Sequence, residues 1–349
     1  MNPLIPGFGL IFLAAVSGGV FAVPLKMRRR YTWENTWLLG FLFALIIIPL
    51  ITVNVFLPMW FAAVRAAGIK AMIIAMVFGF LWGWGSVTFA IGITCIGLSL
   101  GYAVIMGINT VVGSTIPMIR RWGRVPGDAK LVVLLGLLIC LIGTAICGKA
   151  GVMRERVAGS TSEVDALFSG QRSMAMRVFI IGLLWCVLSG VLSACVNLGF
   201  DFANRVSKEA LRLGAHPLSA TLGPWIPVYW GGFLAILIGT GSVMIRQRTW
   251  KNYLAPGTAS DFGFAIILGC LNFLAQIPYG IGAYYLGRLG TTVGWVVNIA
   301  SSLLVANAFG FLTGEWKVAP KSSIKMLYGG LAVLVLSMII LASGNSLAA

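Results

Sequence analysis

One stretch decides the fold of this chain, MIIAMVFGFLWGWGSVTFAIGITCIGLSLGYAVIMGINTVVGSTIPMI, which occupies residues 72–119 and contains no Asp, Glu, Lys or Arg. A helix of about 20 apolar residues is long enough to cross the hydrocarbon core of a bilayer. The stretch therefore predicts two membrane-spanning helices, at 72–94 and 98–119. Because only about three residues separate them, we expect a tight hairpin.

Similar apolar runs continue in both directions from this pair. They lie at 4–24, 37–57, 131–148, 177–199, 222–244, 262–284, 291–313 and 325–344, which gives ten predicted spans. The chain is 59% hydrophobic and 10% charged, whereas soluble domains carry roughly 25% charged residues. The runs are long and do not alternate in polarity, so helices are favoured over barrel strands. We predict an all-α integral membrane protein and exclude a soluble enzyme or a DNA-binding domain.

Basic residues lie mostly between the apolar runs and account for the net charge of +16. This pattern is typical of membrane proteins, in which cytoplasmic loops are enriched in Lys and Arg, so nucleic acid is not an expected partner. The odd-numbered loops hold 15 of the 25 Lys and Arg residues and the even-numbered loops hold 10. We therefore predict a multi-pass protein of the cell inner (plasma) membrane with both termini in the periplasm.

The most hydrophilic part of the chain, residues 151–176, divides it nearly in half. We interpret it as a linker between two five-helix repeats, at 1–150 and 177–349. Gly79, Gly92 and Gly97 recur as Gly269, Gly282 and Gly287 at a constant offset of 190 residues. Five spans in each half is an odd number, so the repeats must insert in opposite senses. Inverted repeats are typical of alternating-access transporters.

A short amphipathic helix is predicted over residues 200–214. Ala203, Val206, Ala210 and Leu213 recur at spacings of three and four, while basic residues occupy the other face. This pattern is typical of a helix that lies on the membrane surface.

Catalytic and metal-binding patterns are missing from the sequence. It contains no nucleophile motif, phosphate-binding loop or Cys/His cluster, and His216 is its only histidine. Such patterns are the usual signs of an enzyme or a structural metal site. We predict a protein that is not an enzyme and that has neither a metal nor a cofactor.

Polar and aromatic residues inside the spans are the candidates for a substrate site near the membrane midplane. They are Trp82, Asn109, Asn197, Asn272, Gln276, Trp295 and Asn298. Because amides in hydrocarbon are costly unless paired, these residues either hydrogen-bond between helices or bind a neutral sugar. In a sugar site, the amides bind hydroxyl groups and an indole stacks on the apolar face of the ring.

Proton coupling requires a group that changes protonation between transport states. Glu34 and Glu315 are the candidate carboxylates, although both fall near predicted helix ends, where a role at the membrane interface or in a loop is the alternative. Burial against neighbouring tryptophans favours the protonated form of a carboxyl, and a nearby cation favours the charged form. The sequence leaves open which effect prevails.

Several segments resemble one transporter family. They are PLKMRRRYTWENTW at 24–37, FGFLWGWGSVTFAIGITCIGLSLGYAV at 78–104, Lys149-Ala150-Gly151 and Gly-Glu-Trp-Lys at 314–317. With these segments the chain resembles the L-rhamnose–proton symporter family of the drug/metabolite transporter superfamily. The resemblance implies ten helices in a five-plus-five inverted repeat and proton-driven uptake of a sugar such as L-rhamnose, with membrane lipids as surroundings. The alternative is an exporter of drugs or metabolites from the same superfamily with a non-sugar substrate.

Overall fold

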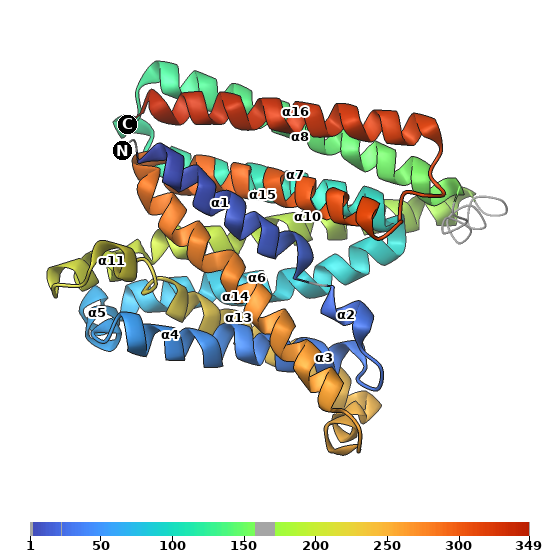
Figure 1. The fold of residues 1–349 in the computed structure, drawn as a ribbon, viewed down its shortest axis with the longest axis horizontal. Coiled ribbons are helices and arrows are strands. Elements are labelled where there is room, and N and C mark those ends of the chain that lie inside the picture. Colours follow the sequence, from blue (N-terminus) through green and yellow to red (C-terminus); the bar gives the residue numbers. More distant parts are fainter. Residues whose placement is uncertain (1–2, 22, 158–171, 349) are drawn as a thin grey trace. The chain divides into compact units, whose positions relative to one another are not determined.

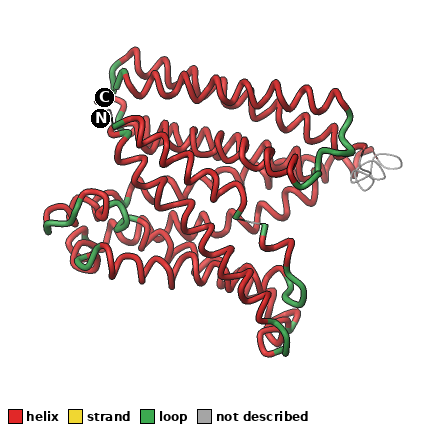
Figure 2. The backbone as a smooth tube through the Cα atoms, in the orientation of Figure 1, coloured by secondary structure: helices red, strands yellow, loops and turns green. Residues whose placement is uncertain are grey.

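Helices make up the regular structure of the parts of the chain that the computed structural model describes, namely residues 3–21, 23–157 and 172–348 (Figures 1 and 2). The helices pack into two units. Unit 1 contains Met1–Trp84 and Cys195–Tyr285, and unit 2 contains Gly85–Ala194 and Leu286–Ala349. Each unit therefore combines segments from both of the predicted halves.

Unit 1 begins with short and medium helices and ends with two long ones. Its elements are α1 (Leu4–Val20), α2 (Pro24–Met27), α3 (Trp33–Leu42), η1 (Phe43–Ile47), α4 (Ile48–Phe56), α5 (Trp60–Ala67), the first part of α6 (Ile69–Ile96), the end of α10 (Arg172–Phe202), α11 (Asn204–Arg212), α12 (Pro217–Ala220), α13 (Trp225–Gln247), η3 (Thr249–Leu254) and α14 (Ala259–Tyr285). Within this unit α1 packs along α14, and α3 packs against α13 and α14 (Figure 1).

Unit 2 is built mainly from long helices. It holds the remainder of α6 and α10 together with α7 (Leu98–Arg120), η2 (Trp122–Arg124), α8 (Gly127–Val157), η4 (Gly287–Leu289), α15 (Gly290–Leu312) and α16 (Lys321–Ser346). The antiparallel helices α8 and α16 form its most extensive helix pair (Figure 1). Of the predicted linker at 151–176, residues 151–157 belong to α8, α10 begins at Arg172, and residues 158–171 lie outside the described residues.

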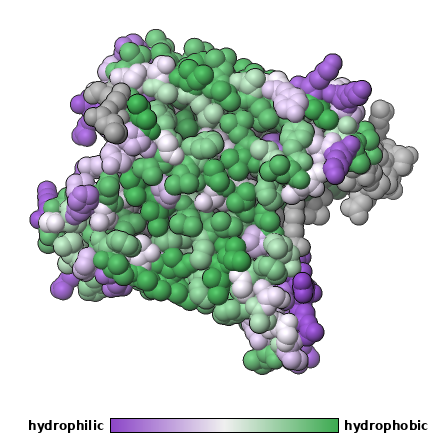
Figure 3. Space-filling model, in the orientation of Figure 1, coloured by the Kyte–Doolittle hydropathy of each residue, from purple (hydrophilic) through white to green (hydrophobic). Residues whose placement is uncertain are grey.

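Nine helical segments within the described residues are long and apolar enough to cross a membrane. They correspond to predicted spans two to ten, and the multi-pass prediction is confirmed. The predicted first span forms α1, an apolar helix of 17 residues that falls below the usual length of about 20. Apolar side chains cover much of the visible surface, and hydrophilic ones gather toward the helix ends (Figure 3).

The second span contains a π-helical turn between two α-helices. Thr32 and Asn35 form a capping box that starts α3, so the exposed backbone groups of the first turn are satisfied. At η1 the backbone N–H of Ile48 bonds the carbonyl of Phe43, five residues earlier. Pro49 follows directly, and a proline ring would clash with the carbonyl four residues before it in an α-helix. The wider turn accommodates this proline.

A single residue, Gly97, joins α6 to α7, which confirms the predicted tight connection. Its φ of 87° lies in the left-handed region that favours glycine. Gly287, found 190 residues later between α14 and α15, also has a positive φ, of 68°. The two predicted equivalents therefore both have a positive φ.

Glycines allow helix backbones in unit 1 to approach closely. A Cβ atom added to Gly79 of α6 would lie 1.9 Å from the carbonyl oxygen of Val228 in α13. A Cβ atom on Gly269 of α14 would lie 2.6 Å from the carbonyl oxygen of Gly40 in α3. Small residues are the usual means by which membrane helices pack at short distance.

A second pair of equivalent glycines makes comparable contacts. Gly92 of α6 packs against Cys186 of α10 in unit 2, where an added Cβ atom would lie 2.6 Å from Sγ. Gly282 of α14 packs against α1 in unit 1, where an added Cβ atom would lie 2.8 Å from the carbonyl oxygen of Gly7. The helices α6 and α14 thus each carry two glycines, spaced 13 residues apart, that contact two other helices.

The predicted amphipathic helix is present as α11. Ala203, Val206 and Ala210 are buried as expected, whereas Leu213 is exposed, because α11 ends at Arg212 and its last turn extends beyond the packed face. The buried side of α11 packs against α5, a short helix that the hydropathy pattern did not reveal. The position of α11 on the membrane surface stays a prediction.

Replacing Gly79 with alanine tests the close contact between α6 and α13. The added methyl group must displace a backbone carbonyl, so we expect a loss of about 1–3 kcal/mol in stability, which is typical of overpacking. Gly329→Ala is the control, because no atom lies within 4 Å of the position of its Cβ. Thermal unfolding in detergent is expected to show a lower midpoint for Gly79→Ala alone, and equal midpoints would contradict the contact.

Candidate functional site

The predicted site residues are divided between the two units. Unit 1 contains Trp82, Asn197, Asn272, Gln276 and Glu34, and unit 2 contains Asn109, Trp295, Asn298 and Glu315. Each group is therefore described within its own unit.

Five aromatic rings form a buried cluster in unit 1, which we call the aromatic cluster: Phe200, Trp225, Tyr229, Phe273 and Tyr279. Trp225 stacks on Phe200 with ring centroids 4.4 Å apart and on Tyr229 at 5.4 Å. Tyr279 meets Trp225 edge-on at 6.3 Å. The rings come from α10, α13 and α14, so the cluster joins three helices of this unit.

Polar atoms at the aromatic cluster are only partly satisfied. The hydroxyl of Tyr279 donates to Oδ1 of Asn197 over 2.5 Å, and both side chains are fully buried. Trp225 Nε1 and Tyr229 OH belong to the cluster and are buried without a hydrogen-bond partner, as is Oδ1 of Asn272, which precedes Phe273 on α14. A buried polar group without a partner costs about 1–3 kcal/mol. These three atoms include donors and an acceptor, which is the combination that a hydroxylated ligand satisfies.

The other two predicted residues of unit 1 lie in different surroundings. Trp82 contacts Gly232, where its ring occupies the space of a Cβ atom, and it lies 6.4 Å from the ring of Phe41. Gln276 is half-buried on α14, one turn after Asn272. The contacts of Trp82 fit helix packing, and Gln276 lies three residues before Tyr279 on the same helix.

In unit 2, α7 and α15 meet at Trp295. Its Nε1 donates to the carbonyl oxygen of Asn109 over 3.3 Å, and its ring lies against Gly113. Oδ1 of Asn109, Oδ1 of Asn298 and Oγ1 of Thr292 are buried without partners. The structure therefore places Asn109 in contact with Trp295, and Thr292 and Asn298 lie three residues before and after Trp295 on α15.

Glu34 is one of the most deeply buried carboxyl groups of unit 1, with 1% of its surface exposed. Its Oε1 accepts a hydrogen bond of 2.8 Å from the hydroxyl of Thr249, and its Oε2 is buried and has no partner. No described cation forms an ion pair with it.

Asn35, the next residue, ties the start of α3 to the loop between α13 and α14. Its Nδ2 donates to the carbonyl oxygen of Thr249, and its Oδ1 accepts from Asn252. Its carbonyl oxygen accepts a bond of 2.8 Å from the hydroxyl of Tyr253. Burial raises the pKa of Tyr253 to about 12, so this hydroxyl stays protonated and remains a donor at neutral pH.

Asp261, at the start of α14, binds the chain just before α3. Its Oδ1 accepts from the backbone N–H groups of Arg29, Arg30 and Tyr31 at 2.6, 3.2 and 3.5 Å. Consecutive N–H groups that converge in this way form an anion-binding concavity. The Arg30 side chain bonds the carbonyl of Pro256 instead.

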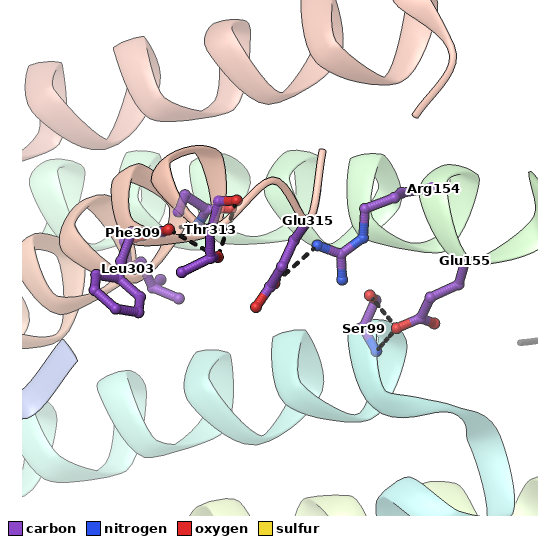
Figure 4. A network of polar contacts seen from close by, with 9 residues as sticks. Ser99, Arg154, Glu155, Leu303, Phe309, Thr313 and Glu315 are labelled. Atoms are coloured by element: carbon purple, nitrogen blue, oxygen red, sulfur yellow. Dashed lines mark hydrogen bonds and ion pairs between the residues drawn. The ribbon is translucent and has the colours of Figure 1, made fainter. Parts of the chain in front are cut away.

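Glu315 lies in a different environment, at the loop between α15 and α16 in unit 2 (Figure 4). It forms an ion pair of 3.5 Å with Arg154, and 40% of its side chain is exposed. The Arg154 guanidinium also lies 4.7 Å from the ring centre of Trp316. Beside it, Glu155 accepts hydrogen bonds from the backbone and hydroxyl of Ser99 at the start of α7. The second carboxyl candidate therefore belongs to a partly exposed network that ties loops together.

The sequence profile of the L-rhamnose-proton symport protein family matches residues 1–348. The chain belongs to this family. Membership of the L-rhamnose-proton symport protein family means that the chain is a transporter and not an enzyme.

Individual relatives in the family match along almost their whole length. L-rhamnose-proton symporters of Pectobacterium atrosepticum and Cronobacter sakazakii are each 26% identical to the chain, and the symporter of Yersinia pestis is 25% identical. In each case the alignment covers 96% of both proteins. The resemblance found in the sequence is confirmed, and the exporter alternative is not favoured.

Several contributors to these sites were missed in the sequence, among them Trp225, Tyr229, Tyr279, Thr292 and Asp261. The segment WIPVYW at 225–230 carries a dense aromatic signal. An aromatic residue in an apolar span is nevertheless more often part of the core, so the signal does not separate the two roles. Asp261 resembles an ordinary acidic residue in the first turn of a helix, and its partners lie about 230 residues away in the sequence.

Proposed function

We propose that the chain takes up L-rhamnose or a closely related sugar together with protons across the inner membrane, by alternating access. The observation that carries the proposal is the aromatic cluster, where buried donors and an acceptor have no partner beside stacked rings. The family and its relatives supply the substrate class.

The chemistry of a deoxy sugar suits this cluster. The hydroxyl groups of such a sugar both donate and accept, so they fit Trp225 Nε1, Tyr229 OH and Asn272 Oδ1. Its methyl group and ring C–H groups are apolar and fit aromatic walls. Asn197 of α10 bonds the Tyr279 hydroxyl of the cluster, and Gln276 of α14 is proposed as a further contact. Within unit 2, Asn109, Trp295 and Asn298 are proposed as a separate group of substrate contacts, because the amide oxygens of Asn109 and Asn298 are unpartnered.

Glycine contacts support a five-plus-five inverted repeat, with halves at 1–150 and 177–349. Gly79 and Gly92 bring α6 against α13 and α10, while Gly269 and Gly282 bring α14 against α3 and α1. In the proposed repeat, α1 is equivalent to α10, α3 to α13 and α6 to α14. Exchanging equivalents turns the contacts of α6 with α13 and α10 into the contacts of α14 with α3 and α1. Inverted repeats of this type underlie alternating access, in which one part of a transporter moves against another.

Glu34 is the proposed proton carrier. It is buried, its one described partner is a neutral hydroxyl, and its second oxygen is free. Glu315 is the other candidate, but it is partly exposed and forms an ion pair with Arg154, so we propose that it ties the loop after α15 to α8.

Replacing Glu34 with glutamine tests proton coupling. We expect the variant to lose rhamnose accumulation driven by an imposed proton gradient while it retains counterflow, because exchange of labelled for unlabelled sugar needs no net proton movement. Transport in proteoliposomes over a range of pH measures both. Glu315→Gln and Glu209→Gln, which changes a carboxyl paired with Arg212 on α11, are expected to keep the wild-type pH profile. A wild-type profile in Glu34→Gln would exclude Glu34 as the carrier.

Tyr229→Phe tests sugar recognition at the aromatic cluster. Removing one hydroxyl that binds the ligand is expected to raise the dissociation constant for rhamnose by about tenfold, the equivalent of roughly 1.4 kcal/mol. Tyr284→Phe is the matched control, because this tyrosine is exposed. Binding is measured by calorimetry on protein in detergent. Equal affinities for the two variants would remove Tyr229 from the proposed site.

The proposed orientation has both termini in the periplasm, from the distribution of basic residues among the loops. A C-terminal alkaline phosphatase fusion is therefore expected to be active, and a C-terminal green fluorescent protein fusion is expected to be dark. The opposite pair of results would reverse the orientation.

A further inference from the structure

Asp261 connects the proposed proton carrier to the proposed substrate site. Its carboxylate is fully buried, and Oδ1 holds three consecutive backbone N–H groups, of residues 29–31. Its Oδ2 is buried without a partner. The contact therefore depends on one charged oxygen, and hydrogen bonds to a charged group are about twice as strong as neutral ones.

The segment that Asp261 holds leads directly into Glu34. Thr32 caps α3 immediately after the three N–H groups, and Glu34 follows in the first turn of that helix. Asn35 and Glu34 bond the loop between α13 and α14 through Thr249. A change in the protonation of Glu34 therefore acts on the segment at residues 29–35. Hydrogen bonds hold this segment at both ends, to Asp261 of α14 and to Thr249.

The same helix carries the substrate residues on the same side. Asn272 and Tyr279 follow Asp261 by 11 and 18 residues, which at 100° per residue places all three within about 20° of one helix face. All three are buried. The distances along the helix axis are about 16 Å and about 27 Å. Asp261 thus lies at one end of a helix face whose other end forms part of the aromatic cluster.

From this arrangement we propose that Asp261 is a positioning residue that transmits the protonation state of Glu34 to α14 and so to Asn272 and Tyr279. The inference rests on the proposed function. The charged and titratable groups of the bonded segment are Arg29, Arg30, Tyr31 and Tyr253, and Glu34 follows in α3. Lys26 lies on α2, which packs against α14, whereas α1, which packs along α14, carries no charge.

The primary test is a double-mutant cycle read by hydrogen exchange, which needs no substrate. In the wild-type background, Glu34→Gln is expected to change the exchange rates of peptides from α14 around Asn272 and Tyr279. In the Asp261→Asn background, the same change is expected to leave those peptides unaffected, because the N–H clamp has lost its charge. An effect of Glu34→Gln on α14 that is equal in both backgrounds would overturn the proposal.

Transport provides the second readout. Asp261→Asn is expected to lower proton-driven accumulation of rhamnose by about fivefold or more, in the range of a typical coupling free energy, while counterflow stays within about twofold of wild type. Loss of both activities in monodisperse protein would also overturn the proposal, since it would mean a general structural role. Arg212→Gln, a surface variant on α11, is the control.

Asp261→Glu covers the case in which Asp261→Asn does not fold. It keeps the charge but moves it by one methylene group, so we expect a partial loss of accumulation with counterflow retained. Wild-type accumulation and counterflow in Asp261→Glu, together with an unchanged hydrogen-exchange response of α14 to Glu34→Gln, would contradict the inference. Failure of the wild-type protein to accumulate rhamnose would instead contradict the proposed function, and the hydrogen-exchange cycle would still test Asp261.

Discussion

Polar groups that lie among apolar helices must find their partners inside the protein, because lipid offers none. In this transporter many polar side chains bond a carbonyl three or four residues earlier in their own helix, and others bond segments that are distant in sequence. Asp261 satisfies three backbone N–H groups where the chain turns from α2 into α3, and Asn35 bonds the loop that precedes α14. These bonds fix the start of α3 and hold the buried carboxyl of Glu34 in place.

The same requirement makes the remaining unpartnered atoms informative. Within the described parts of unit 1 they are confined to a few side chains, namely Glu34, Trp225, Tyr229, Asp261 and Asn272. A chain that satisfies other buried groups so thoroughly leaves these atoms open at a cost of about 1–3 kcal/mol each. On the proposed function, a transported ligand and a transported proton would satisfy most of these atoms.

Most of the architecture could be predicted from the sequence because length and hydropathy alone define a membrane span. The predicted spans at 72–94 and 98–119 form α6 and α7, and their limits agree within a few residues. The resemblance to the symporter family was also correct. The helix α5 was missed because eight residues with one charge carry little hydropathy contrast. Glu34 and Glu315 could not be distinguished, since their difference lies in partners such as Thr249 and Arg154, far away along the chain.

The π-helical turn in the second span has a consequence for the direction of every side chain that follows it. A turn with one additional residue shifts the rotational phase of the subsequent helix by about 100° and its axial register by about 1.5 Å. Pro49, which cannot donate to the carbonyl of Leu45, holds the chain in this wider turn. One imino acid therefore determines which side chains of α4 face protein and which face lipid, including the inward side chain of Val53 and the outward side chain of Val55.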